Sequence, residues 1–162
     1  MRPPQHTGTM DNQTSVNQLR RPFKIIAFDW DGTAVMSRQD DATPVRQRLE
    51  RLLQLGVLVV VISGTNFDNI DRQLSAAIVG SHKTRLYICT NRGSEVFGFD
   101  ARSRPVLLWK RVATPLENRL LTDIADTVRQ TIQSRTGLDI KVIYNRLNRR
   151  KIDLIPLPEW KD

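Results

Sequence analysis

Apolar and polar positions follow a regular order along the chain from residue 23 onward. Residues 23–28 (FKIIAF) and 57–62 (VLVVVI) are short, mostly apolar runs, which are typical of strands buried on both faces of a sheet. Between them, apolar residues recur at helical spacing over 45–53, after Thr43 as a helix N-cap and Pro44 at the first helical position. This strand–helix–strand order predicts two parallel strands joined by a right-handed crossover.

The alternation continues in the next fifty residues. A second helix is predicted from its cap, Asn66, to Gly80, because apolar residues recur there every three or four positions. Residues 85–90 (RLYICT) predict a third strand, and the apolar runs 96–99 and 106–109 flank a polar turn, which favours an antiparallel hairpin. We therefore expect an α/β fold with a Rossmann-like βαβαβ core and a parallel sheet.

The last third of the chain predicts a different unit. The sequence TPLE, which begins at Thr114, is a capping box with proline at the first helical position. It predicts a helix that extends to about residue 135 and ends before Gly137. Strands are predicted at 140–144 and 152–155, so an α+β unit of helix, strand and strand follows the core.

The composition narrows the class of protein. With 162 residues, of which 40% are hydrophobic and 26% charged, the chain can form a modest core, and disordered or collagen-like classes are excluded. The single cysteine, Cys89, excludes a disulfide framework and a cysteine-rich zinc site. The longest apolar run, 57–62, is too short to span a membrane. We expect a cytoplasmic protein in which the polar residues 1–22 form a flexible arm.

The charge balance is strongly basic. Twenty-five Lys and Arg residues against 17 Asp and Glu residues give a net charge of +8, which attracts phosphorylated molecules and other polyanions. The densest basic cluster lies between the last two predicted strands, where either a solvated hairpin loop or a rim that attracts phosphate is expected. A nucleic-acid interface is less favoured, because aromatic residues make up only 6% of the chain and none lies within the cluster to stack on bases. The cluster consists of Arg146, Arg149, Arg150 and Lys151.

Candidate catalytic residues follow two neighbouring strands. The first strand leads directly into Asp29-Trp30-Asp31-Gly32-Thr33, and the second ends at Ser63-Gly64-Thr65. The carboxyl ends of parallel strands meet at one edge of a sheet, where α/β proteins bind their ligands. Two carboxylates one residue apart suit a hard divalent cation and can divide the work between a nucleophile and an acid–base group. The hydroxyl, glycine and helix start of the second motif suit a phosphate group. Taken singly, each motif is also compatible with an ordinary capped turn or loop.

The two motifs together resemble motifs one and two of the haloacid dehalogenase-like (HAD) hydrolase superfamily, whose phosphatases carry the form DxDGT. The resemblance implies that Asp29 is the nucleophile, forms an aspartyl-phosphate and contributes a carboxylate to Mg²⁺. It implies that Asp31 protonates the leaving group, activates water and places its backbone carbonyl on the metal. Ser63 and Gly64 would hold the phosphoryl group.

The segment TNRGSEVF, which begins at Thr90, resembles the Asn-Gly segment of the sugar-phosphatase-like branch of that superfamily, the branch that includes trehalose-phosphate phosphatases and phosphomannomutases. In this branch an αβ cap follows. The resemblance implies an amino-terminal part of the core at 23–112 and a partial cap at 113–162. The last two motifs of the superfamily, a lysine and an acidic pair, are not found: Asp123 and Asp126 lie inside the predicted long helix, and Asp153 lies within a strand.

We therefore expect a Mg²⁺-dependent phosphatase that acts on a phosphorylated small molecule such as a sugar phosphate, in a chain that resembles the amino-terminal portion of a HAD enzyme. A catalytically inert HAD-like binding module and a basic nucleic-acid-binding protein are the alternatives. Within the first motif, Trp30 is predicted to shape the site or pack, and outside the two motifs Cys89 is predicted to be a core residue. His6, in the arm, and His82, in a loop, are predicted to be exposed.

Overall fold

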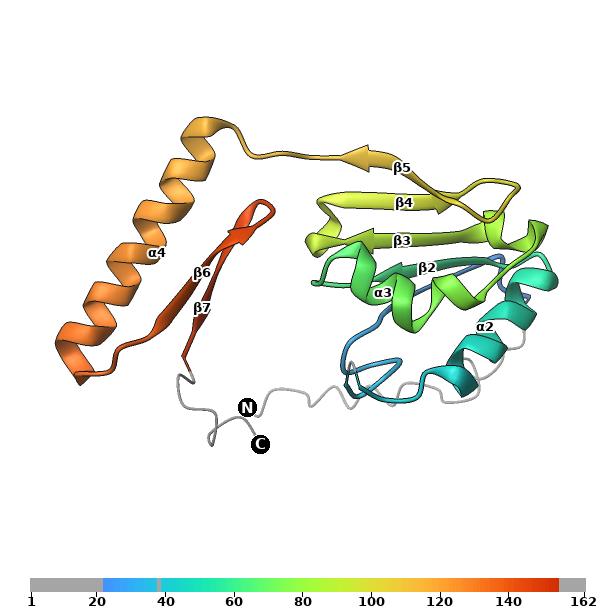
Figure 1. Cartoon of the computed structure of the whole chain (residues 1–162), viewed down its shortest axis with the longest axis horizontal. Coiled ribbons are helices and arrows are strands. Elements are labelled where there is room, and N and C mark those ends of the chain that lie inside the picture. The colour runs from blue at the N-terminus through green and yellow to red at the C-terminus, as the bar shows by residue number, and fades with distance from the viewer. Residues whose placement is uncertain (1–21, 38, 155–162) are drawn as a thin grey trace, which may run out of the picture.

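The computed structural model describes residues 22–37 and 39–154, and Figure 1 shows them as two parts: a sheet with helices against it, and a long helix with a hairpin. The arm expected at 1–22, with His6, lies almost entirely outside the described residues. An extended connection, residues 111–114, follows the last strand of the sheet and joins the two parts (Figure 1). No helix among the described residues is both long enough and apolar enough to cross a membrane.

The main sheet has five strands in the order β1-β2-β3-β4-β5. Its first three strands are parallel, as the strand–helix alternation predicts, and the last two form the expected antiparallel hairpin. In the register, Asp29 lies opposite Ile62, and Ile62 lies opposite Cys89, so the ends of the parallel strands are level. The strands are β1 (Ile25–Asp29), β2 (Leu58–Ile62), β3 (Leu86–Thr90), β4 (Glu95–Phe99) and β5 (Pro105–Lys110).

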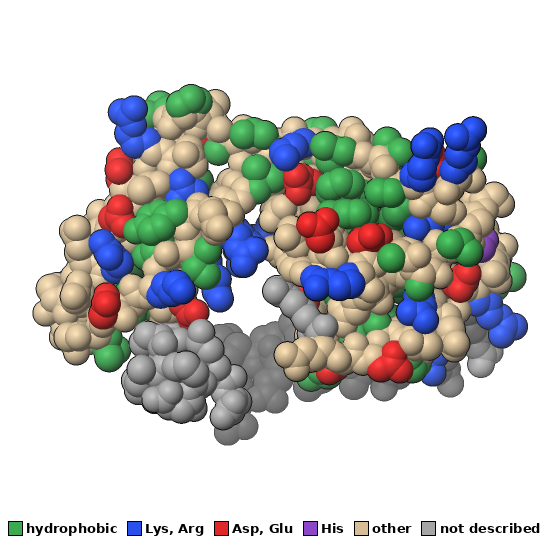
Figure 2. All heavy atoms as spheres, viewed as in Figure 1, with side chains coloured by type: hydrophobic (Ala, Val, Ile, Leu, Met, Phe, Trp, Pro, Cys, Tyr) green, Lys and Arg blue, Asp and Glu red, His purple; other side chains and the backbone are tan. Residues whose placement is uncertain are grey.

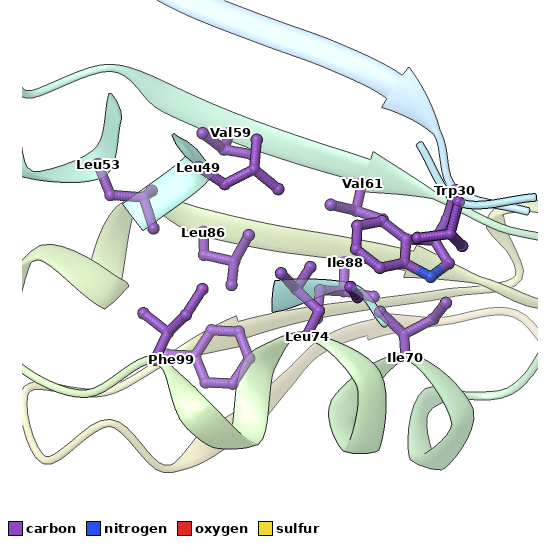
Figure 3. Packing of buried hydrophobic residues seen from close by; sticks show 13 residues of the cluster. Trp30, Leu49, Leu53, Val59, Val61, Ile70, Leu74, Leu86, Ile88 and Phe99 are labelled. Carbon is purple, nitrogen blue, oxygen red and sulfur yellow. The ribbon is translucent and has the colours of Figure 1, made fainter. Parts of the chain in front are cut away.

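The core lies on one face of this sheet (Figure 3). Buried side chains of α2 (Thr43–Gln54) and α3 (Phe67–Gln73) pack against alternate residues of β2 and β3. Val59 and Val61 are fully buried, whereas Ile62 is 42% exposed. The prediction that the strands are buried on both faces is therefore wrong for the described chain, because the helices that pack in the core cover one face only.

Two helix ends differ from their predictions. The N-cap of α2 is Ala42, and Thr43 is already helical. The second helix ends at Gln73 instead of continuing toward Gly80, because the backbone of Leu74 leaves the helical region and a 3₁₀ turn follows at Ser75–Ala77. The cap at Asn66 is confirmed: its side chain accepts a hydrogen bond from the N–H of Asn69.

The second part consists of α4 (Pro115–Thr136) and an antiparallel hairpin of β6 (Lys141–Arg146) and β7 (Arg149–Asp153). The predicted capping box at Thr114 and the left-handed Gly137 at the other end are both present. The basic cluster is not a loop. The turn contains only Leu147 and Asn148, and three of the four cations lie in β7.

Candidate active site

The two aspartates flank a buried tryptophan, Trp30. Asp29 is the last residue of β1, and Trp30 after it is fully buried, with its indole Nε1 donating to Gln73 Oε1 at 2.8 Å. The Trp30 N–H also donates to the Ile62 carbonyl at 3.0 Å. Because one tryptophan between them is fixed in the core, both aspartates stay at the sheet edge, where they line a pocket. Trp30 thus packs, and is not among the residues that line the pocket.

Ser63 connects the second strand to the aspartates. Its side chain is 1% exposed, and its hydroxyl donates to Asp31 Oδ2 at 2.7 Å while accepting from the N–H of Thr65 at 3.0 Å. The N–H of Gly64, next in the chain, donates to no acceptor in the described part of the protein. A bonded hydroxyl and an available backbone donor therefore lie side by side next to the carboxylate.

A third chain segment reaches the same edge after β3. Asn91 and Arg92 have positive φ angles of 50° and 57°, which are unusual for residues other than glycine. Backbone hydrogen bonds hold this turn against the second motif: the Asn91 N–H donates to the Thr65 carbonyl at 2.8 Å and the Arg92 N–H to the Ser63 carbonyl at 3.2 Å. The turn directs Arg92 to the pocket wall. No sequence prediction had placed Arg92 there.

Glu95 fixes the far side of this turn. Its carboxylate accepts from Asn91 Nδ2 at 2.7 Å and lies 2.9 Å from Lys110 Nζ. Burial raises the pKa of Glu95, but hydrogen bonds from Lys110, Asn91 and Thr90 together outweigh it, so the pKa lies below its usual value. The carboxylate therefore stays charged and holds the turn in place at neutral pH.

The hairpin forms the opposite side of the pocket, which has a volume of about 820 Å³. Arg149 donates to the carbonyl of Gly64, a direct bond between the hairpin and the second motif. Figure 2 shows Lys and Arg side chains at the hollow between the two parts. We call the four cations on the hairpin that line the pocket the basic wall: Arg146, Arg149, Arg150 and Lys151.

The turn of the hairpin is tied to the connection between the two parts. Asn148 Nδ2 donates to the Arg111 carbonyl at 2.6 Å, and the Ala113 N–H donates to Asn148 Oδ1 at 2.6 Å. Asn148 has a φ of 54°, a conformation that asparagine tolerates better than most residues. The Asn148 side chain therefore holds the hairpin turn against the connection at residues 111–113.

The oxygen donors at the sheet edge suit Mg²⁺. This cation is usually held in proteins by one or two carboxylates, with water and substrate phosphate completing its six ligands. Asp29 and Asp31 line an open pocket and can provide such donors. Residues 22–37 and 39–154 contain no group of three or more His, Cys, Asp or Glu side chains placed to hold a metal. The residues present thus fit a Mg²⁺ ion that keeps water or phosphate ligands, and not a closed structural metal site.

The structure brings the four predicted residues, Asp29, Asp31, Ser63 and Gly64, into one pocket, and leaves other candidates apart from it. The prediction of an exposed His82 is wrong: its side chain is 18% exposed, with Nε2 lying 3.4 Å from Glu50. The prediction that Cys89 is a core residue is wrong: it is half-buried in β3, on the alternate face from the buried Ile88, and burial raises the pKa of its thiol. Asp123, Asp126 and Asp153 do not line the pocket; the first two lie on α4 and the third in β7.

Comparison with known proteins supports the fold. No protein-family model matches the chain, and neither does any curated protein. Among solved structures, IMP-nucleotidase from Plasmodium falciparum is 9% identical with a TM-score of 0.66, and the match covers 91% of this chain and 39% of that one. Its C-terminally truncated form gives 12% identity and a TM-score of 0.63, over 86% of this chain and 43% of that one.

A haloacid dehalogenase-like hydrolase from B. subtilis also matches, at 17% identity and a TM-score of 0.47, over 75% of this chain and 36% of that one. The chain thus spans about two fifths of the length of the nucleotidase structures. At these identities the likeness is one of fold. The chain has an α/β, Rossmann-like fold that it shares with the nucleotidase structures.

Proposed function

We propose that the protein is a Mg²⁺-dependent phosphatase of the HAD type that acts on a phosphorylated small molecule. The observation that carries the proposal is the direct bond between the two motifs, from the Ser63 hydroxyl to Asp31, in the pocket that Asp29 also lines. Support also comes from the resemblance of both motifs to those of HAD phosphatases, from IMP-nucleotidase, which has a similar fold and whose own structures hold IMP or ATP, and from the cations opposite the carboxylates.

In the proposed reaction, a carboxylate oxygen of Asp29 attacks the phosphorus of the ester. The bond from phosphorus to the leaving oxygen breaks, and Asp31 gives its proton to that oxygen. Asp31 then takes a proton from water, whose oxygen attacks the aspartyl-phosphate, releases inorganic phosphate and restores Asp29. The Gly64 N–H would donate to a phosphoryl oxygen, and the Ser63 hydroxyl would do the same by turning its single hydrogen from Asp31 toward the phosphate. Mg²⁺, held by Asp29 and Asp31, would supply positive charge for these oxygens.

The test is hydrolysis of p-nitrophenyl phosphate by the 162-residue chain. Activity should require Mg²⁺, disappear with EDTA and return when Mg²⁺ is restored. Asp29→Asn should lower turnover at least about a thousandfold, because the amide cannot act as the nucleophile. Asp123→Asn, an exposed change on α4 outside the pocket, is the matched control and should retain activity. Equal turnover in Asp29→Asn and the wild type would contradict the proposal.

A second candidate function is an inert module that binds anions in the same pocket. The observation that favours it is the excess of cations over carboxylates among the residues that line the pocket. Beryllofluoride, which mimics the phosphoryl group on an aspartate, separates the two functions. A Mg²⁺-dependent rise in Tm with beryllofluoride that is lost in Asp29→Asn supports the enzyme, whereas no rise together with binding of inorganic phosphate supports the module.

A further inference from the structure

The pocket holds more positive charge than one phosphate ester requires. Among the described residues, its lining includes two carboxylates, Asp29 and Asp31, and five cations: the basic wall and Arg92. A Mg²⁺ ion would balance the two carboxylates, Asp153 beside Lys151 balances one cation, and a phosphate monoester carries at most two negative charges, so two positive charges remain. Cations that remain together without an anion repel one another, so the residual charge calls for a further negative group.

The five cations are not equally engaged with the protein. Lys151 Nζ lies 3.8 Å from Asp153 Oδ2, so its charge has a partner in the same strand. Arg150 donates to Asn118 and to Thr122 on α4, and these bonds fix it to the helix as part of the scaffold. Arg149 donates to the Gly64 carbonyl, beside the proposed position of the reacting phosphoryl group. These two guanidinium groups therefore have roles within the fold or at the reacting end.

Arg92 and Arg146 are different. Neither guanidinium makes a hydrogen bond or an ion pair with any residue in the described part of the chain, and both line the pocket. Arg92 reaches it from the turn after β3, and Arg146 from the end of β6, so they belong to opposite sides. A guanidinium presents a rigid set of donors that matches phosphate or carboxylate oxygens. Together they offer such donors from both sides of one cavity.

We infer that the substrate carries a second anionic group, besides the phosphoryl group that reacts, and that Arg92 and Arg146 bind it. The inference rests on the proposed function for the position of the reacting group. The volume of about 820 Å³ gives room for a molecule with two charged ends, such as a sugar bisphosphate or a phosphorylated sugar acid. The shared chemistry is an anion that accepts hydrogen bonds from arginine.

Calorimetric titration tests the inference without turnover. The 162-residue chain is used in the Asp29→Asn background with Mg²⁺ at low ionic strength. The probes are glucose 6-phosphate, glucose 1,6-bisphosphate and 6-phosphogluconate. We expect the last two to bind at least about tenfold more tightly than the first. Tight binding of the bisphosphate alone would identify the second group as phosphate, whereas tight binding of both would identify a site for either anion.

Variants then locate the second group. Arg92→Gln and Arg146→Gln should each remove most of the preference for the doubly anionic probes, and Arg146→Lys should restore part of it by keeping the charge. Arg102→Gln, in the exposed turn between β4 and β5, is the matched control and should leave the preference unchanged. Circular dichroism melts verify that each variant is folded.

Equal affinity for the three probes would overturn the inference, as would a preference that persists in both arginine variants. These outcomes are distinct from failure of the proposed function. If wild-type protein hydrolyses no phosphate ester but the preference and its loss are observed, the phosphatase proposal fails while the site for a second anion stands.

Discussion

Replacing Asn148 by alanine removes both hydrogen bonds that tie the hairpin turn to the connection between the two parts of the protein. Each bond joins the side-chain amide to a backbone group, one at Arg111 and one at Ala113, and both measure 2.6 Å. A hydrogen bond of this kind contributes about 1 kcal/mol net. The φ of 54° adds strain of about 1 kcal/mol for alanine, which asparagine tolerates better and glycine avoids.

Asn148→Ala should therefore weaken the attachment of the hairpin by about 3 kcal/mol, and Asn148→Gly by about 2 kcal/mol, because glycine loses the bonds but is not strained. The local opening equilibrium would shift by about 150-fold and about 30-fold respectively. Hydrogen exchange at the amides of β6 and β7 measures this opening directly. Amides of β2, in the core, serve as the internal control and should exchange as in the wild type.

Exchange of the hairpin amides at wild-type rates in Asn148→Ala would show that these two hydrogen bonds do not hold the hairpin in place. Equally fast exchange in the alanine and glycine variants would be explained by loss of the hydrogen bonds alone and would contradict the contribution of backbone strain. Loss of protection in β2 together with the hairpin would show that the two parts unfold as one unit, which contradicts the local attachment proposed for Asn148.

Three further predictions concern the core and the sheet edge. Ser63→Ala leaves the buried N–H of Thr65 without its acceptor and Asp31 without the serine donor. The free energy of unfolding measured by urea titration should therefore fall by about 1–3 kcal/mol, and phosphatase turnover should also fall. Unchanged stability and turnover would contradict these two hydrogen bonds. The pKa of Glu95 is depressed in the folded state. Its contribution to stability is therefore complete above the unfolded pKa near 4.5 and is lost as the pH falls through the folded pKa. Tm should fall less steeply with decreasing pH in Glu95→Gln than in the wild type, and parallel curves would contradict this contribution. Leu53→Ala, at a fully buried position of α2, should cost about 2–5 kcal/mol by denaturant unfolding, and a loss under about 1 kcal/mol would show that the site is not packed as described.

The aspartates and Ser63 could be located from the sequence because their positions depend on local information. Asp29 and Ser63 directly follow apolar runs, Asp31 lies two positions after Asp29, and parallel strands end at one edge, so a correct strand assignment was sufficient to predict their proximity. Trp30 was ambiguous by the same reasoning, because a residue between two functional groups can face either side. Its complete burial decides the question.

Arg92 and the basic wall depend on information that is not local. Arg92 reaches the pocket only because two consecutive residues adopt positive φ without being glycine, which composition does not reveal. The basic segment was predicted as a loop because its charges suggest solvent, yet a two-residue turn is enough and Arg149 begins a strand. Its contact with Gly64 joins positions 85 residues apart, beyond the reach of any pattern along the chain.

The sequence separation of this contact also affects the order in which the two sides of the pocket form during folding. The carboxylates and Ser63 lie at the ends of β1 and β2, which a single helix joins, so their contacts close a short stretch of chain, whereas the contact of Arg149 with Gly64 spans 85 residues. Contacts of small sequence separation form with less loss of chain entropy and therefore tend to form earlier. During synthesis or refolding, the acidic edge would exist before the cations that face it, and recovery of ligand binding would lag behind recovery of the sheet.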